Sequence, residues 1–135
     1  MFNKIRTLHI AVNSLAEATK DFQERFGMKV TRTGELASEG IRNAFIPIGS
    51  DVVIEFIEPL NKKEGAVAKF LQIRGEGVYM MAWEVDNIDQ AVKELQAKGV
   101  RLINAEPEAR ARGANVFVHP KFAHGLMIEL TEKPK

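Results

Sequence analysis

Apolar and polar positions follow one pattern that occurs twice along the chain. Apolar stretches at residues 7–12 ("TLHIAV") and 80–85 ("MMAWEV") are each followed by a short polar turn and then by a segment with apolar residues every three or four positions. This spacing predicts a strand followed by an amphipathic helix in each copy. The apolar helix positions are Leu15, Ala18, Phe22 and Phe26 in the first copy and Ile88, Val92 and Leu95 in the second.

The two copies align without a gap when Val12 is placed over Val85. Ser14 and either Asp86 or Asn87 are expected to cap the helices, because a short polar side chain can accept a backbone N–H of the first turn. Gly27 and Gly99 are expected to end them. Three strand-like segments follow each helix: 28–35, 41–49 and 52–58 in the first copy, and 100–106, 114–120 and 126–132 in the second.

Each copy is therefore a strand–helix–strand–strand–strand (βαβββ) module, and the predicted fold class is α+β. We expect one domain over residues 1–135, with module one at 1–60, a linking helix at 61–75 and module two at 76–135. Neither module alone has enough apolar residues for a core of its own.

The charge balance and the absence of cysteine exclude several classes of partner and of reactive site. The 19 Lys and Arg residues nearly cancel the 18 Asp and Glu residues. No long basic run occurs, so nucleic acid and membrane surfaces are not expected partners. The sequence contains no cysteine, which excludes disulfides, a thiolate nucleophile and thiolate-bound zinc. No stretch looks like a signal peptide or a membrane span, so a cytoplasmic location is expected.

Several stretches resemble the vicinal oxygen chelate (glyoxalase, bleomycin resistance, dioxygenase) superfamily, and within it the methylmalonyl-CoA epimerase family. They are "IAVNSLAEA", "VVIEFIEPL", "AVAKFLQIRGEG", "EVDNIDQAVKELQAKGVRLI" and "VFVHPKFAHGLMIEL". The resemblance implies that the two modules form a cup-shaped, partly open barrel. It also implies a divalent metal held by side chains that point into the cup.

Carried over to this sequence, the resemblance gives a partial ligand set. The acidic last-strand positions are kept as Glu55 and Glu129. The two positions that carry metal-binding histidines in the family are Thr7 and Met80 here, so both of those histidines are absent. A second acid–base position of the family aligns with Ser38, and Glu39 is adjacent to it.

His9 is the residue on which the chemistry depends. Strand alternation places it on the same face as Thr7 and Ala11, whereas Trp83 of the second copy is expected to point toward the helices. His9 could bind a metal together with Glu55 and Glu129, it could bind substrate or transfer protons, or it could be structural. A His and two carboxylates would suit Mn, Co or Fe, and Zn and Ni are also considered; a metal-free cup is the alternative.

Other side chains complete the predicted site. Glu129 and Glu39 are the candidate catalytic carboxylates. Thr7, Met80, His119 and Lys121 are candidate substrate contacts, the last two in a turn that could meet an anionic substrate tail.

The resemblance, together with these residues, implies two candidate functions. The first is an enzyme, an epimerase- or glyoxalase-like isomerase or lyase, which removes a proton next to the carbonyl of a small carbonyl or acyl-CoA-type substrate. The alternative is a metal-free protein on the same scaffold that binds and sequesters a drug or metabolite. A homodimer is expected for either.

Overall fold

The computed structural model describes all 135 residues and confirms the α+β class. The chain divides into two compact units. The first unit is Thr7–Tyr79, and the second unit is Met1–Arg6 together with Met80–Lys135. Each unit is described by itself.

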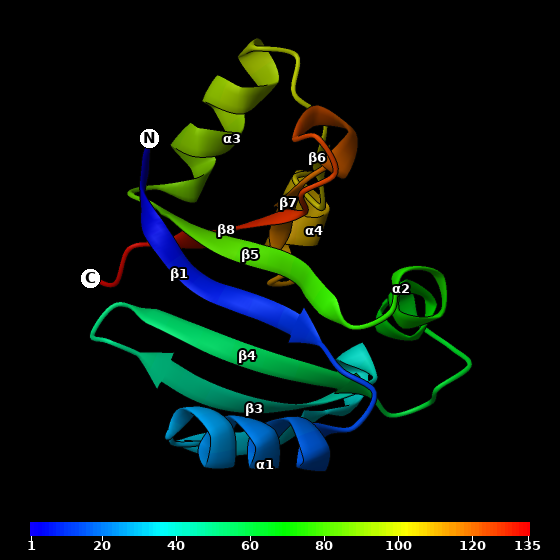
Figure 1. Cartoon of the computed structure of the whole chain (residues 1–135). Coiled ribbons are helices and arrows are strands. Elements are labelled where there is room, and N and C mark those ends of the chain that lie inside the picture. The colour runs from blue at the N-terminus through cyan, green and yellow to red at the C-terminus, as the bar shows by residue number, and fades with distance from the viewer. The chain divides into compact units, whose positions relative to one another are not determined.

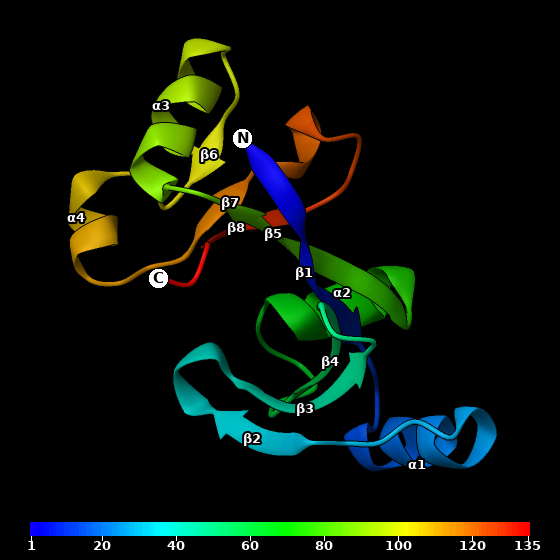
Figure 2. The same ribbon diagram turned by 90° about the vertical axis from the view of Figure 1, so that its left-hand side faces the viewer.

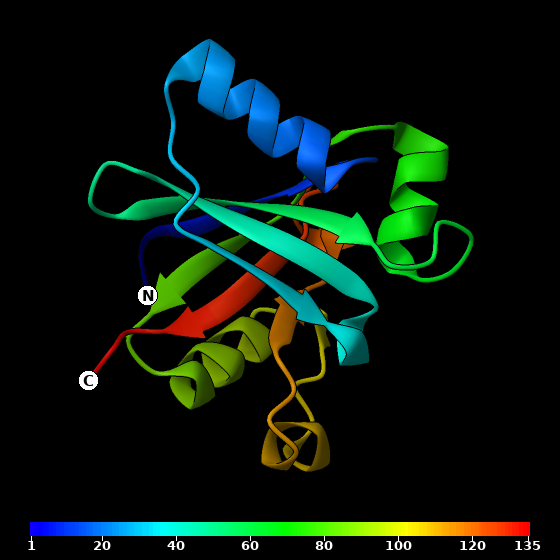
Figure 3. The same cartoon turned by 90° about the horizontal axis from the view of Figure 1, so that it is seen from below.

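The first unit contains one βαβββ module. Its elements are β1 (Phe2–Ala11), of which residues 7–11 belong to this unit, α1 (Leu15–Phe26), β2 (Arg32–Leu36), the 3-10 turn η1 (Ala37–Glu39), β3 (Ile41–Ile48), β4 (Val52–Pro59) and α2 (Ala66–Arg74). The strand order is β2-β3-β4-β1, with β1 parallel to β4 and the other pairs antiparallel. The three antiparallel neighbours run side by side in Figure 3.

Helix α1 covers one face of this sheet (Figure 1). Its apolar side packs on Ile46, Ile54 and Phe56, and the rings of Phe22 and Phe56 meet edge to face with centroids 4.8 Å apart. The opposite face carries Ala11 and Ile57, which pack against α2. Because successive strand residues alternate faces, the residues between the α1-facing ones point to this second face.

The second unit repeats the topology, as predicted. It contains β5 (Gly77–Val85), from Met80 onward, then α3 (Ile88–Ala97), β6 (Leu102–Ile103), α4 (Pro107–Ala111), β7 (Val116–Val118), the 3-10 turn η2 (Pro120–Phe122) and β8 (Ile128–Glu132). The strand order is β5-β8-β7-β6, with β5 parallel to β8. Helix α3 packs on a core that includes Val116, Ile128 and Leu130.

Both predicted helix starts and the end of α1 at Gly27 are confirmed, whereas α3 has its C-cap at Lys98, one residue before the predicted Gly99. The Ser14 hydroxyl accepts the N–H of Glu17 at 3.1 Å, and the Asn87 side chain accepts the N–H of Gln90 at 2.9 Å. Gly27, at the end of α1, has a left-handed backbone conformation with φ of 64°, which costs a glycine little because it has no Cβ.

Some boundaries differ from the prediction. Strand β2 begins at Arg32 instead of residue 28, and β6 is only two residues long. A short helix, α4, occupies part of the loop between β6 and β7 (Figure 2). It starts at Pro107, whose fixed φ suits a first helical position, and it buries Ala109. No helix in the structure is both long and apolar enough to cross a membrane.

Candidate functional site

A buried polar row lies on the sheet face of the first unit that points away from α1. It consists of His9 on β1, Glu55 on β4 and Asn43 on β3. His9 and Asn43 are 6% and 4% exposed, and the Glu55 side chain is 13% exposed. Strand register explains the juxtaposition: His9 is the backbone partner of Glu55, and Asn43 is the partner of Ile57, two residues further along the same face of β4.

The three side chains form a continuous row of polar contacts. Nε2 of His9 lies 3.3 Å from Oε1 of Glu55. Nδ2 of Asn43 donates to Oε2 of Glu55 at 3.1 Å. Both carboxylate oxygens of Glu55 therefore have a partner, whereas Nδ1 of His9 is buried and has none.

The environment favours the ionised form of Glu55. Burial alone would raise the pKa of its carboxyl group. The hydrogen bond and charge of His9, the hydrogen bond from Asn43 and the charge of Arg32 outweigh burial, so the pKa lies below its ordinary value of 4.5. Glu55 is therefore a carboxylate near neutral pH and acts as an acceptor of hydrogen bonds.

Two other residues of the first unit shape this row. Gly34 on β2 is the register partner of Asn43, and a Cβ at this position would lie 3.1 Å from Oδ1 of Asn43. Glycine thus leaves room for the amide. The guanidinium carbon of Arg32 lies 4.2 Å from the centre of the Phe45 ring, and Phe45 is the register partner of Glu55.

Sequence reasoning had not singled out Asn43 or Gly34. A signal was available for Asn43, which is a lone amide in the otherwise apolar run "NAFIPI" and shares a strand face with Phe45. Its role became visible only when the register of β3 and β4 placed it beside Glu55.

Of the predicted site residues, the structure brings His9 and Glu55 together, and Thr7 lies on the same strand face as His9. Glu39 is elsewhere in the first unit. It is exposed in η1 and lines a pocket of about 330 Å³ with the start of α2. The hydrogen bond and ion pair of the polar row do not include Glu39.

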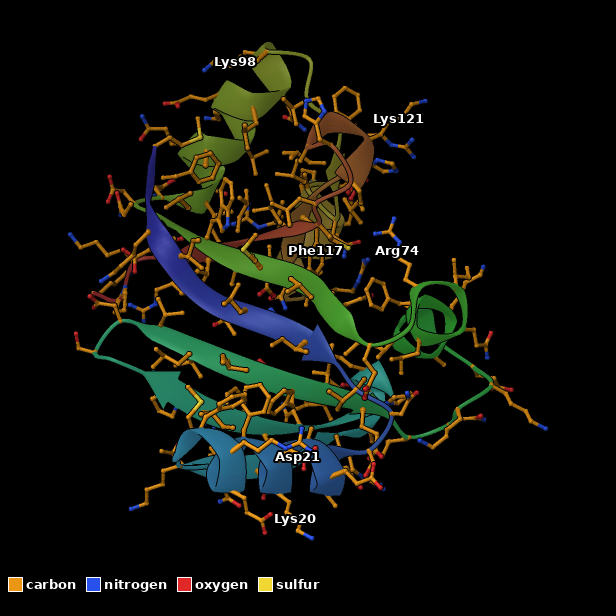
Figure 4. All side chains as sticks on the ribbon, in the orientation of Figure 1. Lys20, Asp21, Arg74, Lys98, Phe117 and Lys121 are labelled. Atoms are coloured by element: carbon orange, nitrogen blue, oxygen red, sulfur yellow. The ribbon has the colours of Figure 1, made fainter.

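The remaining predicted site residues belong to the second unit. Glu129 on β8 is the register partner of Ala82 and of Phe117. Met80 on β5 is half-buried, while His119 and Lys121 lie at η2, where Nδ1 of His119 accepts the backbone N–H of Lys121 at 3.1 Å. Figure 4 labels Phe117 on β7 and Lys121 on η2. Trp83 packs with the α3 core, as predicted.

The donor groups of the polar row do not fit a divalent metal ion. Nε2 of His9 faces a carboxylate, and both oxygens of that carboxylate have hydrogen-bond partners. No group of three or more His, Cys, Asp or Glu side chains in the structure is arranged to hold a metal. The predicted ligands His9 and Glu55 are therefore engaged with each other instead of open to a metal. Glu129, in the second unit, stays a predicted ligand.

Known proteins identify the family. Residues 7–118 match the sequence profile of the Glyoxalase/Bleomycin resistance protein/Dioxygenase superfamily. The chain belongs to this superfamily. Mitochondrial methylmalonyl-CoA epimerase of Dictyostelium discoideum is 32% identical over 132 residues, which cover 96% of this chain and 78% of that protein.

Solved structures of superfamily members agree with this result. Methylmalonyl-CoA epimerase from Mycobacterium tuberculosis is 30% identical, with a TM-score of 0.81 over 97% of this chain and 88% of the other. A variant of the Streptomyces coelicolor methylmalonyl-CoA epimerase, in complex with 2-nitronate-propionyl-CoA, is 28% identical, with a TM-score of 0.85 over the full length of both chains.

Proposed function

We propose that this protein is an epimerase-like isomerase that removes a proton from the carbon next to the thioester carbonyl of a small acyl-CoA. The observation that carries the proposal is the buried His9–Glu55–Asn43 row, in a chain similar to methylmalonyl-CoA epimerases over almost its whole length. An imidazole backed by an ionised carboxylate is an arrangement suited to proton transfer.

Such a reaction needs a group to take the proton and a group to return it. Glu129 is our proposed second proton-transfer residue, because the resemblance assigns an acidic residue to its position on the last strand. Thr7, Met80, His119 and Lys121 are proposed substrate contacts, and Glu39, which is exposed in η1, stays a proposed catalytic carboxylate. Dimerisation and a cytoplasmic location also stay predictions.

Isotope exchange tests the proposal directly. Methylmalonyl-CoA is incubated with the protein in D2O, and deuterium at the carbon between the two carbonyl groups is followed by mass spectrometry. We expect incorporation well above the protein-free rate. No exchange with methylmalonyl-CoA or with other short acyl-CoA esters would contradict an isomerase.

The sequestering protein is the second candidate. The observation that favours it is that His9 and Glu55 are paired with each other, whereas the resemblance implies ligands that are open to a metal. Thermal stabilisation by an acyl-CoA without any exchange would support binding without chemistry.

A further inference from the structure

One buried atom in the first unit has no partner. Nδ1 of His9 makes no hydrogen bond, although the residue is only 6% exposed. Leaving a buried polar atom unpaired destabilises the folded chain, and native structures contain few such atoms. An unpaired nitrogen in the same row as an ionised carboxylate therefore needs an explanation in the function of the protein.

Glu55 determines which nitrogen of His9 carries the proton. An ionised carboxylate only accepts hydrogen bonds, so Nε2, at 3.3 Å from Oε1, is the donor. In a neutral imidazole the other nitrogen then has a free lone pair. In the neutral ring, Nδ1 of His9 is thus an acceptor that nothing in its own unit uses.

The carboxylate is itself held in place. Asn43 donates to its second oxygen, and the absent side chain at Gly34 leaves the space that the amide occupies. This order of groups, a base oriented by a carboxylate that is oriented by a further donor, is the arrangement that activates histidine as a general base in hydrolases.

We propose that Nδ1 of His9 is the base that takes the proton from the substrate carbon, and that Glu55 and Asn43 are positioning residues. This inference rests on the proposed function. The lone pair of Nδ1 forms an N–H bond, the C–H bond breaks, and its electron pair moves onto the thioester carbonyl as an enolate. The resulting imidazolium is stabilised by Glu55, and return of a proton to the same carbon restores the thioester.

The proposed proton transfer does not require His9 to bind a metal. Its Nε2 is occupied by Glu55, so the imidazole cannot bind a metal through that atom without breaking the pair. Nδ1 is buried, so a substrate must displace the groups that cover it. Proton transfer would then occur away from water, where the stabilisation by Glu55 is strongest.

The test compares His9→Gln with wild type in the deuterium exchange assay, after chelator treatment and measurement of metal content. Glutamine can keep an N–H donor near Glu55 but has no basic nitrogen. We expect exchange in metal-free wild type to be unchanged. We expect His9→Gln to lose about 100-fold or more in kcat, with KM for methylmalonyl-CoA within about threefold.

Two further variants complete the design. Glu58→Gln changes another buried carboxylate of β4, which pairs with Arg42 on the opposite face, and it should keep wild-type exchange. If circular dichroism shows that His9→Gln does not fold, His9→Asn takes its place, since it also lacks a basic nitrogen.

The outcomes separate the two proposals. Absence of exchange in wild type overturns the proposed function, and this inference with it. Exchange in wild type that persists in a folded His9 variant overturns only the role of His9. If chelation abolishes exchange and a divalent metal restores it, the reaction requires a metal. That result overturns the proposal that His9 acts without a metal, but it leaves the proposed function in place.

Discussion

The first and second units place a carboxylate at the same register position, but they differ in what lies beside it. Glu55 is paired in register with His9 and Phe45, and Glu129 is paired in register with Ala82 and Phe117. The phenylalanines correspond, whereas an imidazole in the first unit is replaced by a methyl group in the second.

The two units therefore differ in the side chain that lies in register with the carboxylate. The alternation of strand faces, the parallel pair and the antiparallel neighbour are duplicated, so the backbone frame alone does not determine which side chain lies beside the carboxylate. In the first unit the imidazole of His9 lowers the pKa of Glu55, whereas the side chain in register with Glu129 in the second unit is the methyl group of Ala82. Duplicated frames thus diverge through one side chain at an equivalent register position.

The largest effect is expected where the units are alike. Phe56 and Leu130 follow Glu55 and Glu129, face α1 and α3, and are 1% and 3% exposed. Phe56→Ala should lower the free energy of unfolding by about 3–5 kcal/mol and Leu130→Ala by about 2–5 kcal/mol, because each leaves a cavity in a packed core. Urea unfolding measures both, and a loss below about 1 kcal/mol at either position would contradict the equivalence of the two cores.

The second-largest loss of stability is expected when His9, the residue by which the two units differ at this position, is replaced. His9→Ala gives the first unit the residue that the second unit has, and it leaves Glu55 buried without its main partner. We expect a loss of about 3 kcal/mol in the free energy of unfolding. The double variant His9→Ala with Glu55→Ala should lose less than the sum of the single variants, since neither partner is then left unpaired. Additive losses would mean that the pair is not coupled.

Acid should weaken the same pair. The pKa of Glu55 is lower in the folded chain than in the unfolded chain, so its contribution to stability is present above pH 4.5 and is lost as pH falls through the folded pKa. Glu55→Gln removes this contribution. Unfolding at about pH 7 and at about pH 3.5 should therefore show a smaller decrease in stability for the variant than for wild type. Parallel pH dependence in the two proteins would show that Glu55 is not held as described.

The smallest effects test the helix starts. Ser14→Ala and Asn87→Ala each remove a side-chain acceptor from the first turn of a helix, and each should cost about 1 kcal/mol in the free energy of unfolding. Comparing the two losses in free energy of unfolding shows whether the caps of α1 and α3 contribute equally to stability. A change below about 0.2 kcal/mol at one position would show that this cap is replaced by water.

Much of the fold could be read from the sequence because its signals are local. The three- and four-residue apolar spacing predicted the positions of α1 and α3, and glycine and short polar residues marked their ends. The length of β6 and the presence of α4 could not be predicted, since both depend on how the loop after α3 packs, for example through burial of Ala109.

The contacts within the candidate site could be predicted less well from the same local signals. Alternation placed His9 on one strand face with Thr7 and Ala11, and the resemblance added Glu55 to the same site, but neither could say which atoms would meet. That result depends on the parallel register of β1 and β4 and on Asn43, which comes from a third strand. A site whose members are far apart in sequence is defined by strand pairing, which local patterns do not determine.

The position of hydrogen on the His9 ring bears on both the pairing with Glu55 and the proposed role of Nδ1 as the base. In uniformly nitrogen-labelled protein without metal or substrate, long-range proton–nitrogen correlation spectra near neutral pH report which ring nitrogen carries hydrogen, and His9→Gln assigns the signal. We expect the neutral ring to carry hydrogen on Nε2 and to have a free lone pair on Nδ1. Hydrogen on Nδ1 with a bare Nε2 would contradict both the pairing with Glu55 and the proposed base.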